Sequence, residues 1–402
     1  MKKVTKMLLL LVLVVSMLVV PAVATNGAVK ATLHYQNIKI LLDGEEVKPV
    51  DVNGDSTEPF IIDGTTYLPV RAVAEAVGCD VEWDGETNAV SISSEKQDAA
   101  EVITPDPNCD FKVVTLGTGA PPPEMERFGP AVYVEVNGQK LLFDAGRGVM
   151  QRMYQMGISA NDLDMVFITH LHSDHTVGLP DLYLLGMMKG PFGQRFRPFE
   201  ITGVEGTKDM MEHIKQAYAG DIRVRIDDNE MKEEWTQINV TEFSEDGVVY
   251  EKDGVTVTAI ENFHGEAITP SYGFRIDYDG RSVVISGDTK YSENIVENSK
   301  NVDLLIHSVG MANEKLMAQD TPAGATARNV QAHHTSPQEA AQIFNETTPK
   351  LAVFNHMVLF SVTQEQIAER TREYGYTGPL EIARDLMTFE IGETIRVVPY
   401  QA

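Results

Sequence analysis

Cysteine, basic residues and long apolar stretches are all scarce in this chain. Its 402 residues include two cysteines, Cys79 and Cys109, which lack metal-motif spacing and could either pair in an exported protein or stay unpaired. The 33 Lys and Arg are outnumbered by 59 Asp and Glu, for a formal net charge of −26. Because nucleic-acid binding draws most of its affinity from basic patches, and no long Lys/Arg cluster occurs, nucleic acid is disfavoured as a partner.

The one long apolar run lies at the N-terminus. Three lysines precede apolar residues 7–20, and Ala22-Val23-Ala24 provides a small-x-small cleavage site. This order predicts a secretory signal peptide over residues 1–24. The alternative is a membrane anchor, but the run is short for crossing a bilayer and polar sequence follows it. We therefore expect a secreted or cell-surface-associated protein, whose net charge without those three lysines is −29.

A chain of this length is too long for one ordinary core, and its pattern divides it in two. Residues 33–94 predict a small α+β module, and residues 110–402 a second domain. Residues 95–109 form an acidic linker, in which Pro105 and Pro107 favour extended chain. The elements expected in the first domain are strands near residues 38–42, 59–62, 81–83 and 89–92, and a helix over 68–77.

Tyr67-Leu68-Pro69-Val70-Arg71 and Trp83 are the most recognisable positions of the first domain. With the sequence around them they resemble the copper amine oxidase N-terminal-like domain of exported bacterial proteins. The family name does not imply copper here, because the segment has no histidine except His34 at its edge and so lacks a ligand set. We expect a structural or surface-association module that attaches the protein to the cell wall or cell surface.

The second domain alternates strands with helices, which favours an α/β architecture of sheets flanked by helices. It opens with a strand that runs into the turn Gly117-Thr118-Gly119, a weak phosphate-binding signal because no GxGxxG or Walker pattern follows. Its other expected elements are strands over 132–136, 140–143, 165–168, 255–260, 273–278, 282–286 and 350–354, and helices over 149–156 and after Pro337.

Three histidines and an aspartate lie within six residues, directly after the apolar strand 165–168. They are His170, His172, Asp174 and His175. Neutral imidazole and carboxylate are ligands that zinc prefers, and donors this closely spaced in one loop can serve two adjacent metals. The loop therefore predicts a metal site.

This loop has the HxHxDH pattern and resembles the metal-binding motif of the metallo-β-lactamase superfamily. Further residues follow in that family's order, each at the end of an expected strand. The resemblance implies an αβ/βα sandwich and a binuclear zinc hydrolase, with manganese or iron as alternatives. It also implies a first zinc on His170, His172 and His264, a second on Asp174, His175 and His356, Asp288 as a bridge between them, and Asp144 as a support for the loop.

The implied chemistry is attack of a metal-bridging hydroxide on an ester. Asp174 could in addition accept a proton from the nucleophile. The segment His333-His334-Thr335-Ser336-Pro337 and the phrase "PKLAVFNH" resemble the ribonuclease Z-like and arylsulfatase-like branch, in which a histidine protonates the leaving group. His334 is the candidate for this role, unless it only caps or packs near the next helix. His307 replaces a Glu-containing motif of ribonuclease Z and is expected to support the site.

The expected class of substrate depends on one feature of bacterial ribonuclease Z that this chain lacks. Only 23 residues separate His264 from Asp288, which leaves no room for the tRNA-clamping arm of bacterial ribonuclease Z. We therefore expect hydrolysis of a small sulfate or phosphate ester. The alternatives are a ribonuclease Z-like phosphodiesterase of the tRNA 3′-processing type and a non-catalytic, wall-associated binding protein. The apolar segment 187–199 is expected to form a pocket lip, core or a homodimer contact.

Overall fold

The computed structural model divides the chain into two compact units, residues 1–102 and 103–402. The predicted signal peptide, residues 1–24, lies outside the described residues. None of the helices in the described part is long and apolar enough to cross a membrane. The structure describes residues 32–42, 45–51, 55–77, 79–85, 87, 89–94, 104–190, 193, 195–228 and 230–400.

The first unit is the small α+β module that the sequence predicts. In its described part, Ala72, Ala74 and Val81 are the buried apolar residues, and Arg71 donates a 2.7 Å hydrogen bond to the carbonyl of Val81. These contacts join the helix to the hairpin beside it. Its elements are the hairpins β1 (Ile40–Leu42) with β2 (Glu45–Val47), β3 (Phe60–Ile62) with β4 (Thr65–Tyr67) and β5 (Cys79–Asp84) with β6 (Ala89–Ser94), and the helix α2 (Val70–Ala76).

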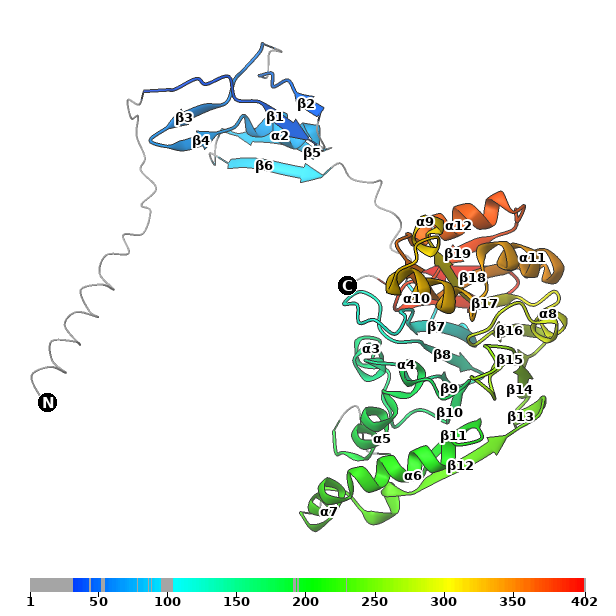
Figure 1. Ribbon diagram of the computed structural model, residues 1–402. Coiled ribbons are helices and arrows are strands. Elements are labelled where there is room, and N and C mark those ends of the chain that lie inside the picture. Colours follow the sequence, from blue (N-terminus) through cyan, green and yellow to red (C-terminus); the bar gives the residue numbers. More distant parts are fainter. Residues whose placement is uncertain are drawn as a thin grey trace, which may run out of the picture. The chain divides into compact units, whose positions relative to one another are not determined.

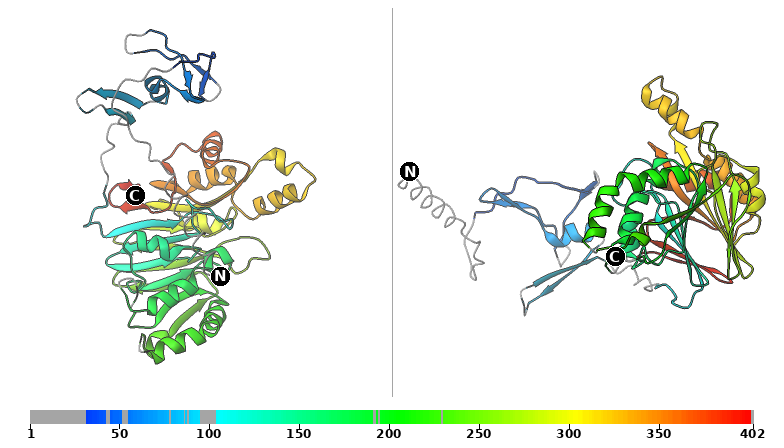
Figure 2. Two further views of the ribbon diagram at one scale, coloured as in Figure 1. Left: turned by 90° about the vertical axis from the view of Figure 1, so that its left-hand side faces the viewer. Right: turned by 90° about the horizontal axis from the view of Figure 1, so that it is seen from below.

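The second unit is built on two sheets that lie face to face with helices outside them, as Figures 1 and 2 show. The first sheet has the order β12-β11-β10-β9-β8-β7-β20-β21 and the second β13-β14-β15-β16-β17-β18-β19. The strands of the first sheet are β7 (Phe111–Gly117), β8 (Ala131–Val136), β9 (Gln139–Phe143), β10 (Met165–Ile168), β11 (Phe199–Val204), β12 (Ile238–Phe243), β20 (Met387–Ile391) and β21 (Ile395–Val398). Those of the second are β13 (Gly247–Lys252), β14 (Val255–Glu261), β15 (Tyr272–Tyr278), β16 (Arg281–Ile285), β17 (Leu304–Ala312), β18 (Leu351–Phe360) and β19 (Leu380–Ile382).

Three apolar layers hold this unit together. Residues such as Phe143, Phe167 and Phe274 pack between the two sheets, and separate clusters join each sheet to its own helices. This is the αβ/βα sandwich that the sequence predicts. The first sheet carries α3 (Val149–Gln155), α4 (Ser173–Thr176), α5 (Leu179–Met187), α6 (Thr207–Ala217), α7 (Ala219–Asp227) and the short 3-10 helix Glu233–Thr236, and the second carries α8 (Glu293–Asn298), α9 (Glu314–Met317), α10 (Pro322–Gln331), α11 (Pro337–Thr347) and α12 (Gln364–Glu373).

The two ends of the apolar segment 187–199 belong to the core. Met187 and Phe199 are buried in the cluster between the first sheet and its helices, together with Tyr183. Phe192 lies outside the described residues. Of the three roles expected for this segment, the structure supports core packing for Met187 and Phe199, whereas Phe196 is 61% exposed.

Candidate metal centre

The strand ends of both sheets meet at one edge of the sandwich, where they present the predicted metal ligands. His170 follows β10, and His172 begins the short helix α4, which carries Asp174 and His175. On the second sheet, His264 follows β14 and Asp288 follows β16. Because the strands that carry them end at this shared edge, the ligands converge although they are far apart in the sequence.

His356 reaches the centre through an irregularity in β18. Asn355 pairs with Ser308 of β17 and Met357 pairs with Val309, so His356 is an extra residue in the strand. Its φ of 45° lies in the left-handed region, which non-glycine residues seldom adopt. Bulges of this kind redirect a side chain next to a functional site. Here the bulge turns the imidazole of His356 toward Asp288.

The structure brings all seven predicted ligands together as two adjoining groups. In each group, every residue offers one donor atom, and these atoms lie within 4.8 Å of one another. The grouping is the one that the sequence predicts, with Asp288 in contact with both. The first group is His170, His172, His264 and Asp288, and the second is Asp174, His175 and His356.

Asp288 occupies the bridging position. Its Oδ2 lies 2.9 Å from Nε2 of His356, 3.5 Å from Nε2 of His175 and 3.6 Å from Nε2 of His264. Burial alone would raise the pKa of Asp288, but His356 and His175 outweigh it and hold that pKa well below its usual value. Burial would likewise lower the pKa of His175, yet Asp288 and Asp144 hold it well above its ordinary value.

Asp144 supports the loop, as the sequence predicts. Its carboxylate accepts hydrogen bonds from the backbone N–H and the hydroxyl of Thr169, and lies 2.7 Å from Nδ1 of His175. The hydroxyl of Thr169 also lies 3.0 Å from Nδ1 of His170. Thr169 was not predicted to take part. Its place between the strand and His170 is the only sequence signal for this role.

Two backbone carbonyls orient two more of the histidines. Nδ1 of His264 lies 2.9 Å from the carbonyl oxygen of His333, and Nδ1 of His356 lies 2.6 Å from that of Gly119. A ring that donates from Nδ1 keeps the lone pair of Nε2 free for a metal. Backbone acceptors have no side-chain signature, so sequence reasoning could not find them.

The donor set fits divalent cations. Nε2 of His170, Nε2 of His175, Oδ2 of Asp174 and Oδ1 of Asp288 are buried without a hydrogen-bond partner. Each buried polar atom left unpaired costs about 1–3 kcal/mol, so four at one point indicate that something else binds them. Imidazole and carboxylate donors suit zinc, and also manganese or iron.

A chamber of about 460 Å³ opens beside the ligands His172, Asp174 and His264. The described residues that line the chamber include no Lys or Arg. Besides the ligand Asp174, Glu124 is the one carboxylate among them. His333 and His334 form part of the wall. The remainder is mainly apolar and includes Pro121, Pro122, Ile268, Val330, Val358 and Phe360.

His334 lies in this chamber, as expected, but burial changes its protonation. Its ring centre is 5.0 Å from that of His264, and its Nδ1 has no hydrogen-bond partner. Burial lowers the pKa of His334 to about 4. The ring is therefore neutral near pH 7, and it can donate a hydrogen bond but does not carry an extra proton.

His307 does not support the site in the way the sequence suggests. Successive residues of a strand face opposite sides of the sheet. Ile306 and Ser308 line a small cavity that Asp288 also borders, whereas the ring of His307 lies 6.1 Å from that of Phe344 on α11. The expectation rested on the correspondence of His307 with a Glu-containing motif, which does not show to which side of β17 the ring points.

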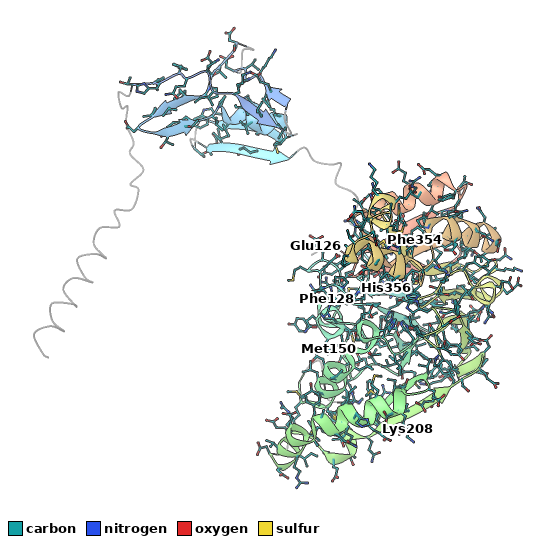
Figure 3. The ribbon with its side chains drawn as sticks, in the orientation of Figure 1. Glu126, Phe128, Met150, Lys208, Phe354 and His356 are labelled. Carbon is teal, nitrogen blue, oxygen red and sulfur yellow. The ribbon has the colours of Figure 1, made fainter. Side chains whose placement is uncertain are left out.

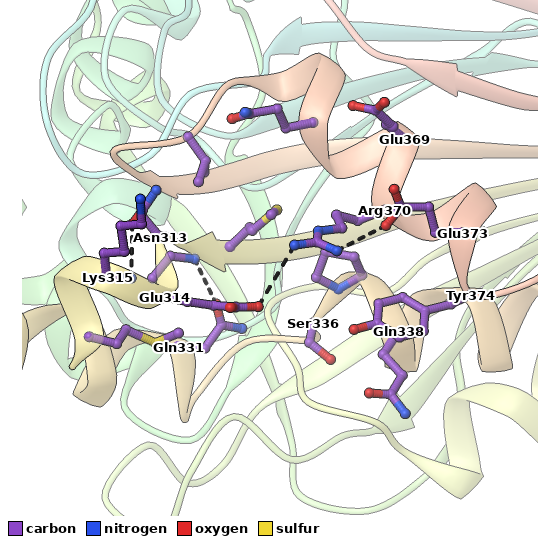
Figure 4. Close-up of a pocket in the computed structure, with 16 residues that line it drawn as sticks. Asn313, Glu314, Lys315, Gln331, Ser336, Gln338, Glu369, Arg370, Glu373 and Tyr374 are labelled. Carbon is purple, nitrogen blue, oxygen red and sulfur yellow. Dashed lines mark hydrogen bonds and ion pairs between the residues drawn. The ribbon is translucent and has the colours of Figure 1, made fainter.

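A second hollow of about 610 Å³ lies between α9, α10, α11 and α12, and is shown in Figure 4. It is polar, and Arg370 lies 2.9 Å from Glu373 and 3.8 Å from Glu314. None of the sequence-predicted site residues lines it. The hollow is therefore distinct from the metal centre.

Comparison with known families agrees with this geometry. Residues 139–357, more than half of the chain, match the model of the β-lactamase superfamily domain. The chain belongs to the metallo-β-lactamase superfamily. It is accordingly a metal-dependent hydrolase that acts on ester bonds. Residues 21–92 match the model of the copper amine oxidase N-terminal domain, as the first-domain motif predicts.

Relatives within the superfamily include ribonuclease Z proteins. Ribonuclease Z of Mycobacterium bovis is 32% identical over 282 residues, which cover 70% of this chain and 98% of that protein. That of Mycobacterium marinum is 31% identical over 284 residues, with 70% and 99% covered. Among solved structures, the short form of human tRNase Z has a TM-score of 0.52 at 24% identity, with 72% of this chain and 100% of that chain covered. The metallo-β-lactamase fold protein YhfI of Bacillus subtilis has a TM-score of 0.54 at 19% identity, with 69% and 98% covered.

His307 should make this hydrolase sensitive to acid. Burial lowers its pKa to about 4, whereas an unfolded histidine ionises near 6.5. The unfolded chain then binds more protons between these values, so the free energy of unfolding should fall by roughly 3 kcal/mol as pH drops through this window. His307→Leu should remove that part of the loss, measured by urea unfolding at about pH 7 and pH 4.5.

The matched control is His213→Leu, because His213 is exposed on α6. It should leave the pH dependence of unfolding as in the unaltered protein. Equal pH dependence in His307→Leu and the unaltered protein would contradict this account of His307.

Proposed function

We propose that the protein is an exported, binuclear metal hydrolase that cleaves a small sulfate or phosphate ester. The observation that carries this proposal is the chamber that opens beside the metal ligands. Its described lining contains neither Lys nor Arg, and most of it is apolar. Such a wall favours a compact ester with an apolar group over an extended polyanion.

The residues of the centre have separate roles in hydrolysis. Two zinc ions held by the seven ligands would supply a water deprotonated near neutral pH and stabilise charge on the ester oxygens. Asp174 borders the chamber and accepts a proton from the nucleophile. His334 donates a hydrogen bond to the leaving oxygen. The apolar wall holds the remainder of the ester away from water.

A ribonuclease Z-like phosphodiesterase is the second candidate, because curated relatives at 31% and 32% identity carry that name. Against it, the residues between His264 and Asp288 form only β15, β16 and their connections. The chain is also strongly acidic, at a formal net charge of −26. We therefore favour a small ester over a tRNA precursor as the substrate.

A substrate screen separates these candidates. The zinc-loaded protein should hydrolyse p-nitrophenyl sulfate, a phosphomonoester or a phosphodiester of similar size, and a chelator should abolish this activity until zinc is restored. Substitution of a residue that only supports a metal ligand typically costs roughly 10–100-fold in activity. His172→Ala removes a ligand itself and should lower the rate by more than this, whereas His213→Ala should not alter it. Cleavage of a tRNA precursor alone would favour the second candidate. A metal-free, inactive protein that binds cell wall would indicate a non-catalytic role.

His334 can be tested with a series of leaving groups. A hydrogen bond to a developing charge is worth about 1.5–3 kcal/mol, so His334→Ala should slow esters with poor leaving groups roughly 10–100-fold. Esters with good leaving groups should be slowed less, and zinc content should be unchanged. His213→Ala is the control, because His213 is exposed on α6. Equal slowing across the series would remove His334 from this role.

Export is proposed from residues 1–24, and the first unit is proposed to associate the protein with the cell surface. In a secreting bacterium, the protein outside the cytoplasm should begin at Thr25, as determined by N-terminal sequencing. Ala24→Phe should block this cleavage. Retention of Met1 on the exported chain would indicate an anchor, and accumulation in the cytoplasm would contradict export.

A further inference from the structure

The turn Gly117-Thr118-Gly119, which the sequence offers only as a weak phosphate signal, lies directly beside the metal centre. The carbonyl oxygen of Gly119 lies 2.6 Å from Nδ1 of His356. The chain passes so close to its neighbours here that a Cβ on Gly119 would lie 2.6 Å from the carbonyl oxygen of Arg127. The position therefore requires glycine, and its task is to present a carbonyl rather than to bind phosphate.

One buried carboxylate holds this turn in place. The side chain of Asp385 is 4% exposed. Its Oδ1 accepts hydrogen bonds from the backbone N–H and the hydroxyl of Thr118, at 2.9 and 2.7 Å. Its Oδ2 accepts from the backbone N–H of Phe128 at 2.8 Å and from Nε of Arg152 at 2.9 Å. All four donors are satisfied by one side chain.

Further contacts extend this arrangement across the loop. Arg127 donates to the hydroxyl of Thr118 at 2.7 Å and to the carbonyl of Ala383 at 2.8 Å. The backbone N–H of Gly119 donates to the carbonyl of Phe128 at 2.7 Å. Figure 3 labels Phe128, which contacts both Asp385 and Gly119, and His356, which contacts Gly119.

We propose that Asp385 is a positioning residue for the second metal group, acting through Thr118, Gly119 and His356. By fixing the Gly119 carbonyl, it keeps the proton of His356 on Nδ1 and leaves Nε2 facing Asp288, 2.9 Å away. This role rests on the proposed two-metal function. Asp385 would thus influence metal affinity although it touches neither substrate nor metal.

Zinc affinity tests this role. In Asp385→Asn, an amide N–H₂ replaces one acceptor and faces the donors, so the turn should shift. One of the two zinc affinities should fall about tenfold while the other is retained, measured by competition with a chromophoric chelator on the full chain. Thr118→Val should act in the same direction, and Thr118→Ser, which keeps the hydroxyl, should restore the affinity.

Asp303→Asn is the matched control. Asp303 is also buried and accepts from the backbone N–H of Ser282 at 2.7 Å and from Lys350 at 2.6 Å, away from the metal ligands. A general loss of stability would lower the melting temperature of both aspartate variants, but only Asp385→Asn should change zinc affinity at one site. Unchanged affinities in Asp385→Asn and Thr118→Val would overturn the proposal.

A measurement without metal keeps the test independent of the proposed function. In metal-free protein with ¹⁵N-labelled histidine, the Nδ1–H of His356 should give a protected NMR signal that Asp385→Asn and Thr118→Val weaken. If the unaltered protein fails to bind two zinc ions, the two-metal function fails, while this signal still decides the positioning role. A signal unaffected by both variants would count against that role.

Discussion

The arrangement of the centre depends on one buried negative charge, that of Asp288. Histidines from both sheets surround it, with His356 at 2.9 Å and His175 at 3.5 Å. A carboxylate without such polar neighbours would be costly to bury at this depth. The ends of the two sheets are therefore coupled electrostatically. The acceptors at Nδ1 of these rings then determine which nitrogen faces the carboxylate.

Sequence reasoning succeeded where the chemistry is local. His170 to His175 form a contiguous motif, and the strands before His264 and Asp288 are apolar enough to be found from their pattern. It failed where the role of a residue depends on the direction of its side chain or on a contact between residues far apart in the sequence. His307 faces the helical side of β17, and Asp385 meets Thr118 across 267 residues without any motif that joins them.

The metal ligands indicate the family of this enzyme, whereas the walls of the chamber bear on its substrate. The match of residues 139–357 places it in its superfamily, and the seven ligands lie within that stretch in one converging centre. The walls are a separate feature of the chamber, and here Pro121, Val358 and Phe360 form an apolar surface beside Asp174. A shared fold does not imply a shared substrate. The relation to ribonuclease Z therefore describes the reacting centre better than it describes what enters the chamber.

The return of the C-terminal segment to the start of the second unit has a consequence for biosynthesis. β20 pairs with β7, and Asp385 lies just before β20. A chain made from its N-terminus thus completes the surroundings of Gly119 only after Asp385 has been added. The seven ligands, of which His356 comes last in the sequence, are therefore made before the carboxylate that holds the Gly119 turn.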